Sequence, residues 1–255
     1  MNSADGGHHA DAVVALADRR YDAAGDAYTR AAWRTLATPR PGHGPFDDDE
    51  KGWVGRGLEH LVTSAACYRV AGRPERAAAR GIEGRAVAHD LRTALTHPAQ
   101  RACLQEIIAD CHVAGDLDGA ADAYADAEAA YREAAGAIDD PRRWGTTPLF
   151  EAAAAPLQQV ARSTADGEIA VAWEDLHGPD PAAPGAFLAH RAAFKRQRLP
   201  ALLATVVEDG YLAAPRGTTE YGNATHECPA CGSSDVNWIA DSTLCLRCSR
   251  PTERR

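Results

Sequence analysis

Apolar positions along the first 140 residues recur at the three- and four-residue intervals of an α-helix. Valine and isoleucine do not gather in alternating runs, so the pattern does not favour a large β-sheet. Alanine dominates the apolar residues, and alanine is the best helix former and small enough for close helix packing. The pattern therefore predicts an all-α fold. The positions at helical spacing are Leu61, Ala65 and Tyr68, then Leu104, Ile108 and Cys111, then Ala120, Tyr124 and Ala127.

Two segments of this region are similar to each other at an offset of 43 residues: residues 68–79 read YRVAGRPERAAA and residues 111–122 read CHVAGDLDGAAD. In both, Val-Ala-Gly is followed after four residues by Ala-Ala. Gly72 and Gly115 stand where a helix commonly ends on a left-handed residue. Each copy is therefore expected to form two helices joined by a tight turn.

The order of glycine, alanine, aromatic residue and alanine at Gly115, Ala120, Tyr124 and Ala127 resembles the tetratricopeptide repeat. In the first copy Gly81 stands where that repeat has an aromatic residue. A third, partial copy near the N-terminus comprises Tyr21, Ala24, Tyr28 and Ala31. The resemblance covers roughly residues 8–138 and implies a right-handed helical-repeat solenoid that binds a protein partner. The copies are further apart than the usual period of about 34 residues, so longer helices or connections are expected.

Beyond Pro141 the repeat pattern fades, although helical spacing continues. Helices are expected over residues 149–164, 168–176, 186–198 and 199–212, with Pro200 in the first turn of the last one. Residues 213–225 contain glycine, threonine and proline and are expected to be a linker. The predicted organisation is a helical-repeat domain over 1–212, a linker over 213–225 and a small domain over 226–255.

The small domain contains two CxxC pairs, separated by thirteen residues, and a metal site is the natural use of this pattern. The four candidate ligands are Cys228, Cys231, Cys245 and Cys248. Four thiolates can close a tetrahedral zinc site and leave no position for a reactive water molecule, so one structural Zn²⁺ is expected. An iron–sulfur or rubredoxin-type iron site and two disulfides are the alternatives.

Each CxxC pair and the turn that follows it form one knuckle. The two knuckles, with the strand-like residues 236–239 and 242–244 between them, resemble the zinc-ribbon family. This family includes ribbons of archaeal and eukaryotic transcription factors. The resemblance implies a small β-structure around the metal. Ser249 departs from the pattern, because a glycine is frequent at that position of the second knuckle. His226, beside the first knuckle, is expected to be a surface residue and not a ligand.

The formal charge is −9, and all but two of the 27 basic residues are arginines. This balance fits either a halophilic proteome or a GC-rich genome. No apolar run reaches the roughly 20 residues that a membrane span needs, and the N-terminus lacks the basic region of a signal peptide. The cysteine usage fits a reduced compartment, so a cytoplasmic protein with no membrane partner is expected.

Basic residues concentrate near the C-terminal part, and Arg191, Lys195 and Arg198 recur at helical spacing. Together they could form a positive surface for phosphates or for a partner, with a solvated helix face as the simpler interpretation. The full candidate set is Arg191, Lys195, Arg196, Arg198, Arg247 and Arg250.

The sequence contains no GxGxxG, Walker, GxSxG or HExxH motif, and we expect no enzyme. The leading hypothesis is a non-enzymatic, zinc-binding scaffold or adaptor that contacts a protein. The alternative is a nucleic-acid- or transcription-associated protein that uses the ribbon and the basic face of residues 191–198.

Overall fold

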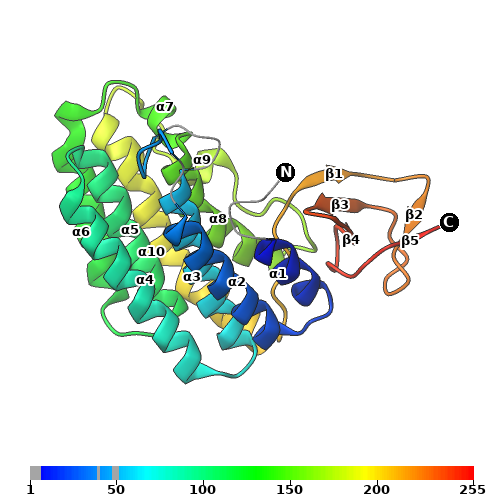
Figure 1. Cartoon of the computed structure of the whole chain (residues 1–255). Helices are drawn as coiled ribbons and strands as arrows, with labels where there is room; N and C mark the ends of the chain where they lie inside the picture. Colours follow the sequence, from blue (N-terminus) through cyan, green and yellow to red (C-terminus); the bar gives the residue numbers. More distant parts are fainter. Residues whose placement is uncertain (1–6, 39–40, 48–51) are drawn as a thin grey trace.

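The computed structural model of the protein describes residues 7–38, 41–47 and 52–255. Over these residues the chain is mostly helical, and the strands lie in a small C-terminal part (Figure 1). The helices are α1 (His8–Ala17), α2 (Tyr21–Ala37), α3 (Trp53–Val70), α4 (Pro74–Ala94), α5 (Pro98–Ala114), α6 (Ala120–Glu133), the short 3₁₀ helix η1 (Ala134–Ala137), α7 (Pro141–Gly145), α8 (Pro148–Ser163), α9 (Trp173–Leu176) and α10 (Pro184–Glu208). The strands are β1 (Thr218–Glu220), β2 (His226–Glu227), β3 (Val236–Ile239), β4 (Ser242–Cys245) and β5 (Glu253–Arg254).

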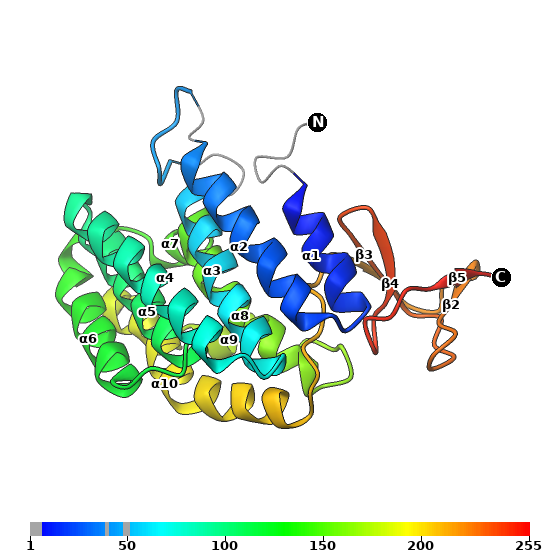
Figure 2. The ribbon, with the colours of Figure 1, turned by 60° about the horizontal axis from the view of Figure 1, so that its bottom comes forward.

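The first six helices form three helical hairpins, α1/α2, α3/α4 and α5/α6, which lie side by side in Figures 1 and 2. Each hairpin turn contains a left-handed residue soon after the first helix ends: Arg19 (φ 60°), Gly72 (φ 68°) and Asp116 (φ 55°). After each of these residues an N–H donates back across the turn, as from Arg73 to the carbonyl of Tyr68 at 2.8 Å. The α5/α6 turn has a second left-handed residue, Gly119 (φ 87°), directly before α6. The predicted helix–turn–helix units and the left-handed Gly72 are confirmed.

Gly115 differs from its prediction. Its φ is −81°, so it continues the helical conformation, and Asp116 takes the left-handed position. Gly115 is needed for a different reason, the close approach of α4 to the end of α5. A Cβ on Gly81 would lie 2.8 Å from the Cα of Gly115 and 2.7 Å from the carbonyl oxygen of Cys111. The glycine found at the aromatic position of the first repeat copy is therefore explained by helix packing.

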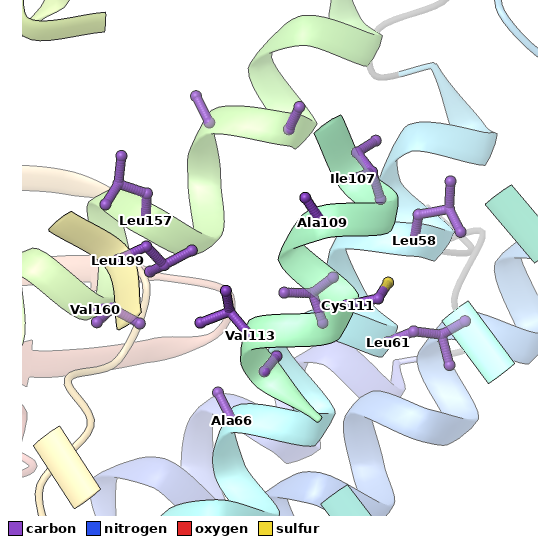
Figure 3. Close-up of a cluster of buried hydrophobic side chains, with 14 of the residues drawn as sticks. Leu58, Leu61, Ala66, Ile107, Ala109, Cys111, Val113, Leu157, Val160 and Leu199 are labelled. Atoms are coloured by element: carbon purple, nitrogen blue, oxygen red, sulfur yellow. The ribbon is translucent and has the colours of Figure 1, made fainter. Parts of the chain in front are cut away.

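The core is continuous through the helical body and is rich in alanine. Figure 3 shows side chains from α3, α5, α8 and α10 meeting in it, among them Leu58, Ile107, Leu157 and Leu199. Burying one such leucine contributes about 1.5–3 kcal/mol, so this layer provides a large share of the favourable term. Helix α8 is central, because most of its residues are buried between α3 and α10.

Two sequence expectations about the later helices are wrong. Residues 186–212 do not form two helices, because α10 runs unbroken from Pro184 to Glu208 with Pro200 inside it. Proline removes one helical hydrogen bond, but Leu199 and Leu203 on either side of it are buried in the core, and this packing holds the helix together. Of the expected helix over 168–176, only the single turn α9 forms.

The C-terminal part contains two small antiparallel sheets, one of order β1-β3-β4 and one of β2 with β5. Residues 213–225 are not simply a linker, since β1 lies within them and pairs with β3, with Thr218 opposite Trp238. The amide side chain of Asn237 helps to hold this segment, accepting from the N–H of Gly217 at 2.8 Å and donating to the carbonyl of Pro215 at 2.9 Å. We call residues 216–255 the C-terminal lobe; it lies beside α1 (Figure 2).

Among the helices of the described residues, none has both the length and the apolar character needed to cross a membrane.

Candidate metal centre

Four cysteine side chains of the C-terminal lobe converge on one point. Cys228 and Cys231 lie in the turn after β2, Cys245 ends β4, and Cys248 lies in the following turn. All four sulfur atoms lie within 4.8 Å of one another. Three of the Sγ–Sγ distances, from Cys228 to Cys248 and from Cys231 to Cys245 and Cys248, are 3.6 Å.

These distances match a metal–thiolate site. A tetrahedron with metal–sulfur distances of about 2.3 Å places its sulfur atoms about 3.8 Å apart. A disulfide would need about 2.05 Å between sulfurs, and the four cysteines are free. Within the described ranges this is the one group of three or more Cys, His or acidic side chains able to hold a metal ion. The C-terminal cysteine cluster could therefore bind a metal.

The two knuckles have the same backbone form. In the first, the N–H of Gly232 donates to the carbonyl of Cys228 at 2.8 Å, and in the second the N–H of Ser249 donates to the carbonyl of Cys245 at 3.0 Å. Gly232 (φ 73°) and Ser249 (φ 57°) are both left-handed. Ser249 thus occupies the position where the ribbon pattern usually has a glycine, and it adopts the conformation that a glycine would favour.

The local environment favours a thiolate at one ligand. A hydrogen bond from the Cys248 thiol, together with the backbone N–H groups of Cys248 and Arg247, lowers the pKa of Cys245 to about 5 although burial opposes it. The pKa of Cys248 is raised, first because it is hydrogen-bonded to Cys245. Thiols must lose their protons to bind a metal, and a lowered pKa at Cys245 favours this step. Cys228 and Cys245 are buried, whereas Cys231 is exposed.

His226 is not a surface residue, contrary to the sequence expectation. It is buried beside the ring of Trp238, at 5.2 Å between ring centroids and nearly perpendicular. Its Nδ1 lies 3.0 Å from the hydroxyl of Thr225 and 3.3 Å from the amide oxygen of Asn223. It therefore supports the start of the lobe and stands outside the cysteine cluster.

The candidate basic surface is not formed as predicted. Arg191 and Lys195 are 2 % and 0 % exposed, so they face the core and not the solvent. Arg196 is half-buried and pairs with Glu128 at 3.1 Å, which leaves Arg198 as the exposed member of this face. In the lobe, Arg247 pairs with Glu168 and with Asp235, and Arg250 donates to the carbonyl of Ala17 at 3.5 Å.

The buried cations belong to an internal ion-pair network between α5 and α10. Nε of Arg191 lies 2.7 Å from Oε1 of Glu106, and Nζ of Lys195 lies 2.8 Å from the same oxygen. Lys195 also reaches Oδ2 of Asp110 at 2.6 Å. Two cations and two carboxylates thus neutralise one another inside the body. Their attraction offsets the large desolvation free energy of burying each charge.

Tyrosines from α6 complete the network. The hydroxyl of Tyr131 donates to Glu106 at 2.8 Å and that of Tyr124 donates to Asp110 at 2.5 Å. Burial alone would raise the pKa of Glu106, but the charges of Arg191 and Lys195 outweigh it and lower the value to about 2. At Asp110 burial dominates and raises the pKa to about 6, with Glu106 adding to the increase against the opposing charge of Lys195.

The acids of this network were missed by the sequence analysis, although a signal was present. Glu106 and Asp110 are four residues apart within the mostly apolar run 102–111, and Arg191 and Lys195 have the same spacing. Two acids on a buried helical face need two cations on another helix to neutralise them. The acid pair and the basic pair have the same spacing, so they can face each other across two helices. Every charge of the network is buried and paired within the body.

Comparisons of the chain with protein-family models, with curated proteins and with solved structures gave no match. The interpretation of the cysteine cluster therefore rests on its own geometry and donor set.

Proposed function

We propose that the C-terminal lobe binds one structural zinc ion through Cys228, Cys231, Cys245 and Cys248. The observation that carries this proposal is the convergence of four sulfur atoms within 4.8 Å, at distances suited to a tetrahedral site. Four thiolates are a common structural zinc set, and they leave no open position for a reactive water. The lobe's strands have only two to four residues each, so the metal supplies stability that so small a core lacks. Iron in the same four-sulfur geometry is the competing occupant.

The test is the metal content of the purified protein. We expect one zinc per chain in the native protein and none in Cys228→Ser/Cys245→Ser. The matched control is Cys67→Ala, which removes a buried thiol of the helical body and should leave one zinc per chain. Stoichiometric iron, or no metal in native protein purified without chelators, would contradict the proposal.

We further propose that the helical body is a non-enzymatic scaffold that binds a protein partner, with its hairpins arranged as a tetratricopeptide-like, right-handed solenoid. Three successive hairpins support this proposal, because arrays of helix pairs present extended surfaces for partners. An open groove of about 480 Å³ at the ends of α4, α5 and α6 offers one such surface. Its polar lining includes Arg92, Arg101, Gln105 and Glu133.

The scaffold proposal is tested by affinity capture at high salt, followed by cross-linking and identification of the cross-linked residues. We expect a partner cross-linked at the groove, captured at least several-fold less by Arg101→Glu and unchanged by Arg198→Glu, an exposed arginine of another helix. Capture of no partner above background would contradict the scaffold role.

Of the two features behind the nucleic-acid alternative, the ribbon and the basic face of residues 191–198, the second is weakened, since Arg191 and Lys195 pair with Glu106 and Asp110 in the core. We therefore retain the protein-binding scaffold as the proposal.

A further inference from the structure

The second cysteine knuckle, residues 245–250, is also where the lobe meets the helical body. The carbonyl oxygen of Leu246 packs directly against Gly167, where a Cβ would come within 1.7 Å of it. Arg247 pairs with Glu168 in the same segment. The first knuckle has a different setting, since Pro229 and Ala230 at its tip are exposed.

Ser249 joins this knuckle to the chain that leaves the body. Its hydroxyl oxygen accepts from the N–H of Ala214 at 3.0 Å and from the hydroxyl of Tyr211 at 3.2 Å. The Tyr211 ring in turn lies under the guanidinium of Arg19, 4.4 Å from its centroid, in the turn between α1 and α2. The residues next to Ala214 are held by the body, because the N–H of Leu212 donates to the hydroxyl of Tyr21 at 3.3 Å.

The contrast with the first knuckle shows why serine is found there. Gly232, at the equivalent position, is exposed, and a Cβ built on it would have no neighbour within 4 Å. Ser249 is 3 % exposed and adopts the same left-handed conformation, which costs a side-chain-bearing residue roughly 1 kcal/mol or more. The two hydrogen bonds to its hydroxyl, one buried and one partly buried, offset this cost. The second knuckle, which faces the body, therefore has a serine at this position, and the first knuckle, which faces solvent, has a glycine.

We propose that metal binding and docking of the lobe on the body are coupled through the second knuckle, with Ser249 as the positioning residue. The inference rests on the proposed metal site. The metal fixes the backbone of residues 245–248, and that backbone places Leu246, Arg247 and Ser249 against residues 166–168 and 211–214. Loss of the metal releases these contacts. It also uncovers the face of α1 that borders, with β4 and β5, a groove of about 300 Å³.

Hydrogen exchange at three amides separates the steps of this coupling. The N–H of Ala214 reports docking through Ser249, and that of Leu246 reports folding of the lobe, because it donates to the carbonyl of Asp235 at 2.9 Å. The N–H of Leu212 reports the body. Metal content is measured on the same samples. On removal of the metal by a chelator, we expect exchange at Ala214 and Leu246 to accelerate at least tenfold, with Leu212 changing far less.

Ser249→Gly keeps the left-handed backbone and deletes the hydroxyl. We expect it to retain one metal per chain and normal protection at Leu246, while Ala214 exchanges about tenfold faster. The matched control is Thr252→Ala, which removes a hydroxyl bonded within the lobe to the carbonyl of Thr243, and it should leave Ala214 unchanged.

Each contrary outcome identifies what fails. A native protein without metal rejects the proposed metal site itself. Stoichiometric metal whose removal leaves Ala214 protected rejects the coupling alone. Unchanged Ala214 exchange in Ser249→Gly, or loss of its metal, rejects the positioning role of Ser249.

Discussion

The helical body and the C-terminal lobe each contain a cluster of four ionisable side chains, but the charges of the two clusters are balanced in different ways. In the body, Glu106 and Asp110 meet Arg191 and Lys195, so the charges cancel within the chain. In the lobe, four cysteines converge, and as thiolates they would all carry negative charge. A close cluster of like charges needs an external counter-charge, whereas a buried cluster of both signs is neutralised by the side chains of its own helices. The body should therefore be self-sufficient, and the lobe should depend on a cation.

The largest effect is expected from removing that cation. Chelation, or the Cys228→Ser/Cys245→Ser change, should abolish the folded state of the lobe, because metal binding in small thiolate domains is worth on the order of 10 kcal/mol of folding free energy. The helical content of the body should remain. Amide exchange resolved by residue, combined with far-ultraviolet circular dichroism, measures both. A lobe that stays protected without metal would remove the distinction between the two regions.

The second effect comes from breaking the internal network. Glu106→Gln leaves two buried cations with a single carboxylate, and should lower the free energy of unfolding by about 3–5 kcal/mol in urea denaturation. Metal content should not change. Glu208→Gln, an exposed acid at the end of α10, is the control and should stay within about 0.5 kcal/mol. A loss below 1 kcal/mol for Glu106→Gln would show that the network does not stabilise the body.

The third effect is the acid dependence of the same network. The pKa of Glu106 in the folded protein, about 2, lies below its ordinary value of 4.5. The unfolded chain therefore binds more protons in this range, and the stabilisation is complete above pH 4.5 and is lost as the pH falls through 2. The expected loss is about 3 kcal/mol.

Asp110, with its pKa raised to about 6, acts in the opposite sense: it lowers stability as the pH rises from about 4 to 6. Urea titrations of metal-free Cys228→Ser/Cys245→Ser between pH 2 and 6, with and without Glu106→Gln, isolate the contribution of the network. Parallel pH profiles for the two proteins would contradict the assignment.

The smallest effect is expected at Arg198, the exposed arginine of the predicted basic face of residues 191–198. Arg198→Ala should change the free energy of unfolding by no more than about 0.5 kcal/mol in thermal denaturation. Lys195→Met, three residues earlier on the same helix, should cost several kcal/mol, because it leaves two carboxylates to share one cation. Equal effects at the two positions would mean that burial does not distinguish them.

Features set by neighbouring residues could be predicted from the sequence. The CxxC spacing brings each pair of cysteines together within one turn, and the Val-Ala-Gly pattern predicts the left-handed Gly72 just after α3. Features that depend on distant packing could not. Lys195 is 85 residues from Asp110, so periodicity within α10 gives no sign of whether its face meets solvent or α5. Pro200 is typical of a helix start when only the sequence is considered. It lies inside α10 because residues on both sides of it are buried against other helices, which the local sequence does not reveal.

The lobe illustrates the same limit. Residues 218–220 have the composition of a linker, and they become a strand only because β3 offers them a partner. Ser249 was noted as an exception to the ribbon pattern, but its reason lies in Tyr211 and Ala214, outside the lobe.

The most direct test of this account is X-ray absorption spectroscopy of the purified protein at the zinc and iron edges. The account predicts zinc with four sulfur neighbours at about 2.3 Å and no nitrogen or oxygen in the first shell. An iron edge, a mixed shell of sulfur and nitrogen, or cysteines oxidised to disulfides would contradict the claim that the lobe is held by a four-thiolate zinc site.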